Sequence, residues 1–309
     1  MSDANVVRGS QGSVRPRKPK KHPAGRALGR TILVVVLTLG AIAMIAPFIW
    51  MLLTSLKTPA ELTTFTWLPK TLRWRNYIDA LSSAPFGLYF RNTVILTVGQ
   101  TAITLAFATS AGYALACTPM RGRKVLSGFV IVMIMVPFYV ILVPEFLIVK
   151  SIPFFGGNNI LGQGGTGWLN SWWGLIIPFA IEPIYVFLAR QFFISLPQEL
   201  AEAARADGLS EYGIFFRIMA PLIKPAIITI AVFQIGAAWN SFLWPLLITR
   251  DDSLRPIQVG LATFSQDPLN VQWAYLMAGA TLAVLPMILL FMVAQKYFIE
   301  GMASAGIKG

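Results

Sequence analysis

Four of the 13 acidic residues lie in one short segment of the chain. The segment spans residues 195–221 and reads SLPQELAEAARADGLSEYGIFFRIMAP. Pro197 suits the start of a helix, and Glu199 and Glu202 place negative charge in its first turns, where the helix dipole favours it. Gly208 suits the left-handed position that follows a helix. The pattern predicts two short helices joined at this glycine.

The first of these helices has a candidate docking face. Leu200, Ala203, Ala204 and Asp207 share one side at helical spacing. Small alanines would allow another protein to approach closely, and the carboxylates could pair with basic residues of that protein. The alternative is an ordinary amphipathic surface helix, which physical reasoning alone favours over a docking element.

The second helix has its own start signal and apolar face. Ser210 is a suitable N-cap, and Ile214, Phe215 and Ile218 form the face that we expect to be buried. Pro221 then re-orients the chain into the next apolar stretch.

Polar residues inside apolar stretches are costly in lipid and are therefore candidates for function. Glu182 lies about ten residues into such a stretch, roughly 15 Å deep at helical rise, and should face the interior of a helix bundle. It could accept hydrogen bonds from a polar substrate or serve as the partner of a polar group in a neighbouring subunit. Glu145, near the end of an earlier stretch, fits a position at the membrane interface.

A second polar set lies in the stretch that follows the charged segment. It comprises Gln234, Trp239, Asn240 and Ser241. Gln234 and Ser241 are seven residues apart and so should share a helix face. Amides and aromatic rings suit a ligand with hydroxyl groups and apolar C–H faces, although packing and hydrogen bonds between helices explain them equally well.

Composition decides what kind of protein positions these residues. The chain has 309 residues, of which 56% are apolar and only 12% charged, about half the charged fraction of a soluble domain. Eight of its 25 basic residues fall in residues 1–30, which read as a disordered cytoplasmic tail beside anionic lipid rather than a nucleic-acid site. The single Cys117 and single His22 exclude an intrachain disulfide and argue against histidine chemistry or a metal site.

Six apolar stretches are long enough to cross a bilayer. They are Thr31–Leu56, Asn92–Met120, Val125–Pro144, Trp172–Phe193, Pro225–Thr249 and Val271–Gln295. The first is too long for the core of a signal peptide and should remain attached. An even number of spans places both termini on the same side of the membrane. With the N-terminus inside, 17 of the 25 basic residues lie on the inner side, so we expect both termini in the cytoplasm.

The outer loops of this topology are residues 57–91, 150–171 and 250–270. The second is rich in Gly and Asn (GGNNILGQGGTG) and has too little bulky apolar surface to order itself alone. We therefore expect three parts: the tail 1–30, a transmembrane domain 31–300 and a cytoplasmic tail 301–309. No internal repeat typical of secondary transporters is evident.

The charged segment resembles the EAA signature of ABC importer permeases. Glu202-Ala203-Ala204, Gly208 and the pair Ile218 and Pro221 have its spacing, whereas Ala220 stands where the family usually has Leu. The resemblance implies an all-α, type I ABC importer permease (MetI-like) fold with six helices, its core at about residues 88–296. It also implies a cytoplasmic coupling helix between helices four and five.

Three further stretches are similar to the maltose-type (MalG-like) carbohydrate permeases. They are FLARQFF (187–193), WNSFLWP (239–245) and YFIEG with the terminal GIKG (297–309). The resemblance assigns coupling to an ATPase to Glu199, Glu202, Ala203, Ala204, Asp207, Gly208 and Pro221. The residues left as candidates for the substrate path are Glu182, Gln234, Trp239, Asn240 and Ser241.

The resemblance implies a subunit of a bacterial inner-membrane complex. Its partners would be a homologous permease, two cytoplasmic ATPases and an extracytoplasmic solute-binding protein, which the loop 250–270 could touch. The chain has no GxxxxGK[ST] loop, so ATP and Mg²⁺ would bind the ATPases and this chain would hold no cofactor. It also has no HExxH, GxSxG or CxxC motif, so we expect a transporter of sugar rather than an enzyme. Glycerol 3-phosphate or another polyol as cargo, and a proton-coupled transporter that uses Glu182, remain as alternatives.

Overall fold

The computed structural model describes residues 23–64, 66–265 and 271–306, and every regular element in these ranges is a helix. The chain forms two units, residues 1–50 and 51–309, which are described separately. The first unit contains most of α1 (Pro23–Ser55), whose portion Gly29–Ser55 is long and apolar enough to cross a membrane. This matches the first predicted span, but the helix begins inside the predicted tail 1–30, whose residues 1–22 lie outside the described ranges.

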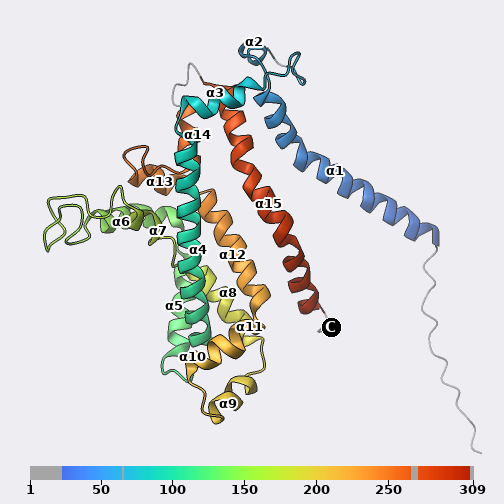
Figure 1. Cartoon of the computed structure of the whole chain (residues 1–309). Helices are drawn as coiled ribbons and strands as arrows, with labels where there is room; N and C mark the ends of the chain where they lie inside the picture. The colour runs from blue at the N-terminus through green and yellow to red at the C-terminus, as the bar shows by residue number, and fades with distance from the viewer. Residues whose placement is uncertain (1–22, 65, 266–270, 307–309) are drawn as a thin grey trace, which may run out of the picture. The chain divides into compact units, whose positions relative to one another are not determined.

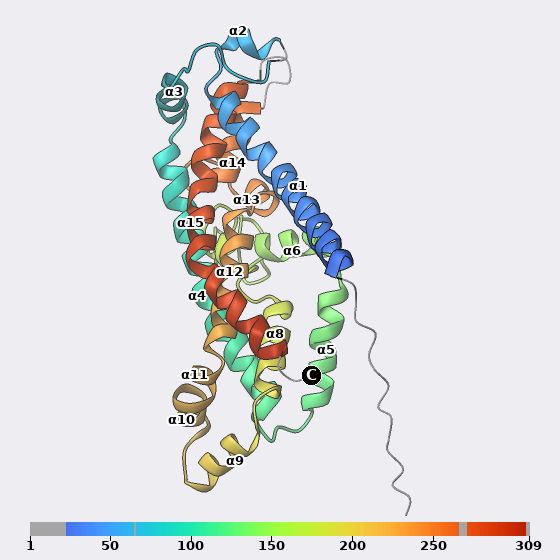
Figure 2. The same cartoon turned by 90° about the vertical axis from the view of Figure 1, so that its right-hand side faces the viewer.

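The second unit is built from long helices and short connecting helices (Figures 1 and 2). The longer ones are α4 (Phe86–Cys117), α5 (Arg123–Met135), α6 (Phe138–Lys150), α8 (Pro183–Ile194), α12 (Lys224–Trp239) and α15 (Trp273–Gly306). The shorter ones are α2 (Pro59–Leu62), α3 (Arg75–Ser83), α7 (Trp172–Ile176), α9 (Glu199–Ala206), α10 (Glu211–Ile214), α11 (Ala220–Leu222), α13 (Leu243–Ile248) and α14 (Ile257–Ala262). A π-helical turn, Phe215–Met219, joins α10 to α11, and a 3-10 turn, Thr263–Ser265, follows α14.

Helix α4 is the centre of this unit and packs against both α8 and α12 (Figure 1). At Gly112 the approach of α8 is so close that an added Cβ would lie 2.6 Å from the Cβ of Ala189. Small residues at helix contacts are typical of membrane bundles. In lipid the hydrophobic effect does not drive helices together, and close packing of their backbones stabilises the contact between them instead. Three short elements, α2, α3 and α14, lie near the start of α4, whereas α9 and α10 lie near its end.

Several predicted spans are interrupted rather than continuous. Helices α5 and α6 meet at an angle of 102° across Val136 and Pro137. Pro137 has no N–H to continue a helix, and Val136 before it is extended, as a residue before proline prefers to be. The fourth stretch divides into α7 and α8, and α12 ends at Trp239, ten residues before the predicted end of its stretch.

The last turn of α7 and the non-helical backbone that follows it are stabilised by side chains of α4. Gln100 donates to the carbonyl of Leu175 at 2.9 Å, and Thr104 donates to that of Ala180 at 2.8 Å. Backbone carbonyls away from water need such partners, so polar residues on α4 permit the interruption of a span. Three helices in the described residues are long and apolar enough to cross a membrane, or five if each bent pair is one span.

The Gly-rich loop between α6 and α7 is organised by hydrogen bonds, not by an apolar core. The amide of Asn158 donates to the carbonyls of Lys150 and Ile152 at 2.8 and 3.0 Å, and its oxygen accepts from the N–H of Gly165 at 2.8 Å. Five glycines of the loop have positive φ angles, which explains their number. The large apolar side chains Phe154, Ile160 and Leu161 are exposed, so hydrogen bonds of the buried Asn158 order the loop in place of an apolar core.

Candidate coupling and substrate sites

Helix α9 has the ends that the sequence predicts. Gly208 lies just beyond it with φ of +84°, the left-handed conformation, and its N–H donates to the carbonyl of Arg205 at 3.0 Å. The N–H of Leu209 donates to the carbonyl of Ala204 at 3.0 Å, which completes the turn. The helix itself starts at Glu199 and not at Pro197, because Gln198 is its N-cap.

One residue of the predicted docking face of α9 is buried within the chain. Ala201 and Ala204 are buried against the cluster around Phe193 and Ile214. Of the four residues expected to share a face, only Ala204 is buried, whereas Leu200, Ala203 and Asp207 are exposed. Ala204 therefore packs inside this chain together with Ala201, and Leu200, Ala203 and Asp207 are the residues of the predicted face that another protein can reach. Glu199 and Glu202 are exposed as well, so all three acidic side chains are accessible to another protein.

The second short helix begins and packs as predicted. The Ser210 hydroxyl accepts from the N–H of Gly213 at 3.3 Å, so Ser210 caps α10. Ile214 and Phe215 are buried and Ile218 is partly buried against the same cluster. The π-helical turn was not predicted, and Pro221, in α11, is exposed.

Arg205 and Glu211 join α9 and α10 to the end of α4. Arg205 Nε lies 2.5 Å from Glu211 Oε1, and its Nη2 donates to the carbonyl of Cys117 at 2.7 Å. The hydroxyl of Tyr113 donates to Glu211 Oε2 at 2.6 Å. We call Arg205, Glu211, Tyr113 and the Cys117 carbonyl the latch. Its charged hydrogen bonds satisfy a free carbonyl at the end of α4 and hold both short helices to that end.

The sequence contains no local signal for the latch. Tyr113 and Glu211 are 98 residues apart. Arg205 and Glu211 are separated by a glycine turn and are not at a helical spacing. One signal could have been noticed: Arg205 lies next to the alanines of a short helix that is otherwise acidic, and this indicates a carboxylate partner.

Glu182 occupies a different position from the one predicted. It is not inside a helix but is the N-cap residue of α8, and its side chain makes no capping hydrogen bond. Together with Glu145 and Ser241 it lines a cavity of about 650 Å³. Glu145 is half-buried in α6 and faces this cavity, and the interfacial position expected for it stays a prediction. The break before Pro183 causes the difference, because it replaces the predicted helix interior with extended backbone.

Gln234 and Trp239 bond to other parts of the bundle. Gln234 is 1% exposed, and its amide nitrogen lies 3.3 Å from both the Gln100 side-chain oxygen and the Phe179 carbonyl. The indole N–H of Trp239 donates to the carbonyl of Ala283 at 3.0 Å. These contacts match the packing interpretation that the sequence left open for the pair.

Asn240 and Ser241 do not continue the helix of Gln234. Asn240 is the C-cap of α12, exposed, and its amide donates to the carbonyl of Gly236 at 2.8 Å. Ser241 follows the helix, so the predicted shared face of Gln234 and Ser241 is wrong. Ser241 instead faces the cavity of Glu145 and Glu182.

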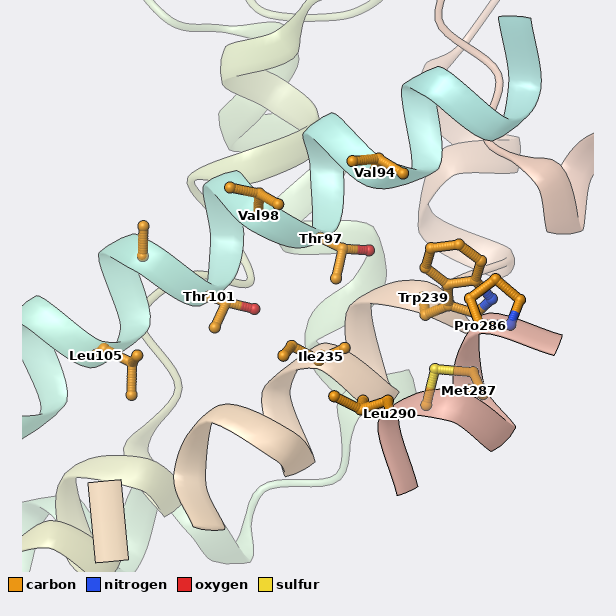
Figure 3. A pocket seen from close by; sticks show the side chains of 11 residues that line it. Val94, Thr97, Val98, Thr101, Leu105, Ile235, Trp239, Pro286, Met287 and Leu290 are labelled. Carbon is orange, nitrogen blue, oxygen red and sulfur yellow. The ribbon is translucent and has the colours of Figure 1, made fainter. Parts of the chain in front are cut away.

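The ring of Trp239 lines a separate groove between α4, α12 and α15 (Figure 3). This groove has a volume of about 460 Å³, and Thr97 and Thr101 are the polar residues on its wall. Val98, Ile235 and Leu290 supply much of the rest. Its composition suits an apolar neighbour rather than a hydroxyl-rich ligand.

No group of three or more His, Cys, Asp or Glu side chains that could hold a metal ion occurs in the part of the chain that the structure describes. Long apolar helices, interrupted spans and a charged helical turn at one end define the class as a polytopic membrane transport protein. The family model described as the binding-protein-dependent transport system inner membrane component matches residues 109–304. The chain belongs to this family, whose members are membrane permease subunits of ABC importers and not enzymes.

Curated relatives cover nearly the whole chain. The arabinooligosaccharides transport system permease protein AraQ of Bacillus subtilis is 32% identical over 94% of this chain and 99% of its own length. The sulfoquinovosyl glycerol permease SmoH of Agrobacterium fabrum is 31% identical over 85% of this chain and 88% of its own. The trehalose/maltose permease MalG of Thermococcus litoralis is 29% identical over 91% and 98%. The predicted MalG-like relationship is thus confirmed.

One solved structure has the same fold as this chain over almost the whole of this chain. It is a chain of a bacterial ABC transporter involved in the import of the acidic polysaccharide alginate, 25% identical, with a TM-score of 0.76. The match covers 91% of this chain and all of that chain. The predicted all-helical, MetI-like permease fold is therefore confirmed, as is a location in the bacterial inner membrane.

Proposed function

We propose that this chain is one of two permease subunits of an ATP-driven, binding-protein-dependent carbohydrate importer. In this proposal α9 is the coupling helix that contacts a separate cytoplasmic ATPase. The observation that carries it is the exposure of Glu199, Glu202 and Asp207 on a helix that the latch bonds to α4. A partner that pushes on α9 would thereby move the central helix of the permease.

The same proposal assigns the partners. A homologous permease completes the translocation path, two ATPases bind ATP and Mg²⁺, and an extracytoplasmic solute-binding protein delivers the cargo. The names of the relatives support this assembly, because they describe transport-system permeases for several oligosaccharides. A neighbour in a second structure, at 14% identity, shares the fold alone.

The proposed topology has six spans with both termini in the cytoplasm. Three long helices and two bent pairs account for five spans, and α7, the segment 177–182 and α8 together make one interrupted span. The excess of basic residues on the inner side supports this orientation and places α9 in the cytoplasm. The proposed domain limits are unchanged at 31–300, with the family core at about 88–296.

For the substrate path, the structure favours some of the candidates. Glu182 and Ser241 line the cavity and are the residues that we propose for contact with cargo. Gln234 and Trp239 instead stabilise the bundle through the hydrogen bonds described above, and Asn240 caps α12. Glycerol 3-phosphate or another polyol remains the alternative cargo for the same architecture.

The test of coupling uses the assembled transporter in proteoliposomes. Glu202→Lys reverses a charge on the exposed face of α9, and we expect a loss of both uptake and binding-protein-stimulated ATP hydrolysis. Ser82→Lys, at an exposed position of α3 near the start of α4, is the control and should retain both. Unchanged stimulation and uptake in Glu202→Lys would refute the coupling role. A proton-coupled transporter would instead show uptake by this chain alone, driven by a pH gradient and indifferent to ATP.

A further inference from the structure

The cavity beside α6, α8 and α13 is acidic. Glu145 and Glu182 contribute two carboxyl groups and Ser241 one hydroxyl, and the other lining residues are apolar or aromatic. No Lys, Arg or His occurs among the described residues that line it. In either protonation state, therefore, this wall supplies no positive charge.

The two carboxyl groups are available to a ligand. The Oε2 atom of Glu145 is buried and accepts no hydrogen bond from the described residues. Glu182 is an N-cap residue whose side chain does not cap its helix. Buried polar atoms normally have partners, so the unpaired Glu145 oxygen beside a second carboxyl group on the same cavity indicates a partner that arrives from outside. Hydroxyl or ammonium groups of a ligand are suitable donors.

An aromatic wall faces the same space. Phe179 packs edge-on against Phe138 at 5.6 Å and against Trp244 at 5.3 Å between ring centroids. The indole N–H of Trp244 donates to the carbonyl of Gly174 at 2.9 Å, which fixes the position of its ring. Phe138 and Phe179 are only half-buried, so ring surface remains for the apolar C–H faces of a sugar.

We infer that this cavity recognises hydroxyl-rich ligands without negative charge, namely neutral or amino-substituted oligosaccharides, and disfavours uronates, sulfonates and phosphates. This inference rests on the proposed carbohydrate importer and specifies its substrate class. It sets this chain apart from the structural neighbour involved in the import of acidic alginate and from the sulfoquinovosyl glycerol relative. An anionic cargo would meet two carboxyl groups and no compensating cation on this side of the path.

The charge of the cavity can be measured without knowing the natural cargo. Ser241→Cys places a thiol on its wall, and the native Cys117 is buried and should react slowly. The measurement uses the assembled complex at alkaline pH, so that both carboxyl groups are ionised, and partner subunits free of reactive cysteines. The rate with a cationic methanethiosulfonate, divided by the rate with an anionic one of equal size, should be about tenfold higher for this thiol than for a free thiol. The added changes Glu145→Gln and Glu182→Gln should return the ratio to that of the free thiol. A ratio that favours the anionic reagent, or one that both changes leave unaltered, would overturn the inference.

Ligand class is tested in the same variant by protection. Arabinotriose at millimolar concentration should slow the labelling of Ser241→Cys, and trigalacturonic acid should not. Equal protection by both, or by neither, would contradict the inference. Uptake by the complete importer separates the proposed function from the inference about the cavity.

If the importer takes up no carbohydrate while the labelling ratio still favours the cationic reagent, the proposed function fails and the negative charge of the cavity stands. If the importer takes up trigalacturonic acid as fast as arabinotriose, the inference fails and the proposed function stands.

Discussion

Tyr113→Phe removes a single hydroxyl from the latch and leaves the ring packed. The hydroxyl lies 2.6 Å from the carboxylate of Glu211, which also pairs with Arg205. A hydrogen bond to a charged group contributes about 1.5–3 kcal/mol, and we use the low end because the Glu211 side chain is 42% exposed. A loss of about 1.5 kcal/mol makes separation of α10 from α4 about ten times more frequent.

The consequence should appear in coupling rather than in assembly. In proteoliposomes that contain the whole transporter, we expect ATP hydrolysis to continue while the amount of substrate imported per ATP falls by up to about tenfold. The physical reason is that the ATPase would still move α9 and α10, but α4 would follow less often.

The chain offers a matched control at the other end of the same helix. Tyr89 is also buried in α4, and its hydroxyl donates at 2.9 Å to Asp252, a carboxylate that pairs with Arg255. Tyr89→Phe therefore removes the same kind of hydrogen bond and should lower the stability by a similar amount. The amount of substrate imported per ATP should stay that of the unmodified transporter. If the two variants import the same amount of substrate per ATP, the latch does not transmit motion and the reasoning is wrong.

Three further predictions follow from other contacts. Gly112→Ala should destabilise the complex by about 1–3 kcal/mol because its Cβ meets Ala189, whereas Gly128→Ala, with open space around it, should not; melting temperatures check this. Gln234→Leu should lower the melting temperature, because Gln234 bonds to Gln100, and should leave the KM for uptake unchanged, because we propose no contact between Gln234 and cargo; a raised KM would contradict this. Hydrogen bonds from Ser253 and Asn170 lower the pKa of Asp251, so their stabilising effect should be present at neutral pH and be lost as the pH falls through that pKa. The protection factor for hydrogen exchange at residue 253, which corrects for the intrinsic pH dependence of exchange, should therefore fall in acid, and Asp251→Asn should abolish this change.

The ends of the short helices could be predicted from the sequence, because they depend on a few neighbouring residues. Gly208 and Ser210 predicted the end of α9 and the start of α10, because the left-handed turn and the hydroxyl cap depend on only a few residues around them. The long apolar stretches likewise identified α1, α4 and α15. Such features are decided by local backbone chemistry and by run length.

Features decided by contacts between distant segments were not predictable. The bend at Pro137, by contrast, has a local signal in the proline itself, which a reading by run length overlooks because the apolar stretch continues through it. Glu182 was assigned to a helix interior because Gln100 and Thr104, which stabilise the interrupted backbone, come from a different stretch. The latch also joins residues far apart in sequence, so only the fold brings Tyr113 and Glu211 together.

The central claim is that an ATPase contacts the exposed face of α9, and photo-crosslinking in the purified, assembled transporter tests it most directly. A photoreactive phenylalanine analogue at Ala203, exposed on α9, should form a product with the ATPase subunit that mass spectrometry identifies, and the same analogue at Ser82 on α3 should not. If the analogue at Ala203 captures only lipid or water, or if Ser82 captures the ATPase instead, the proposed coupling helix is wrong.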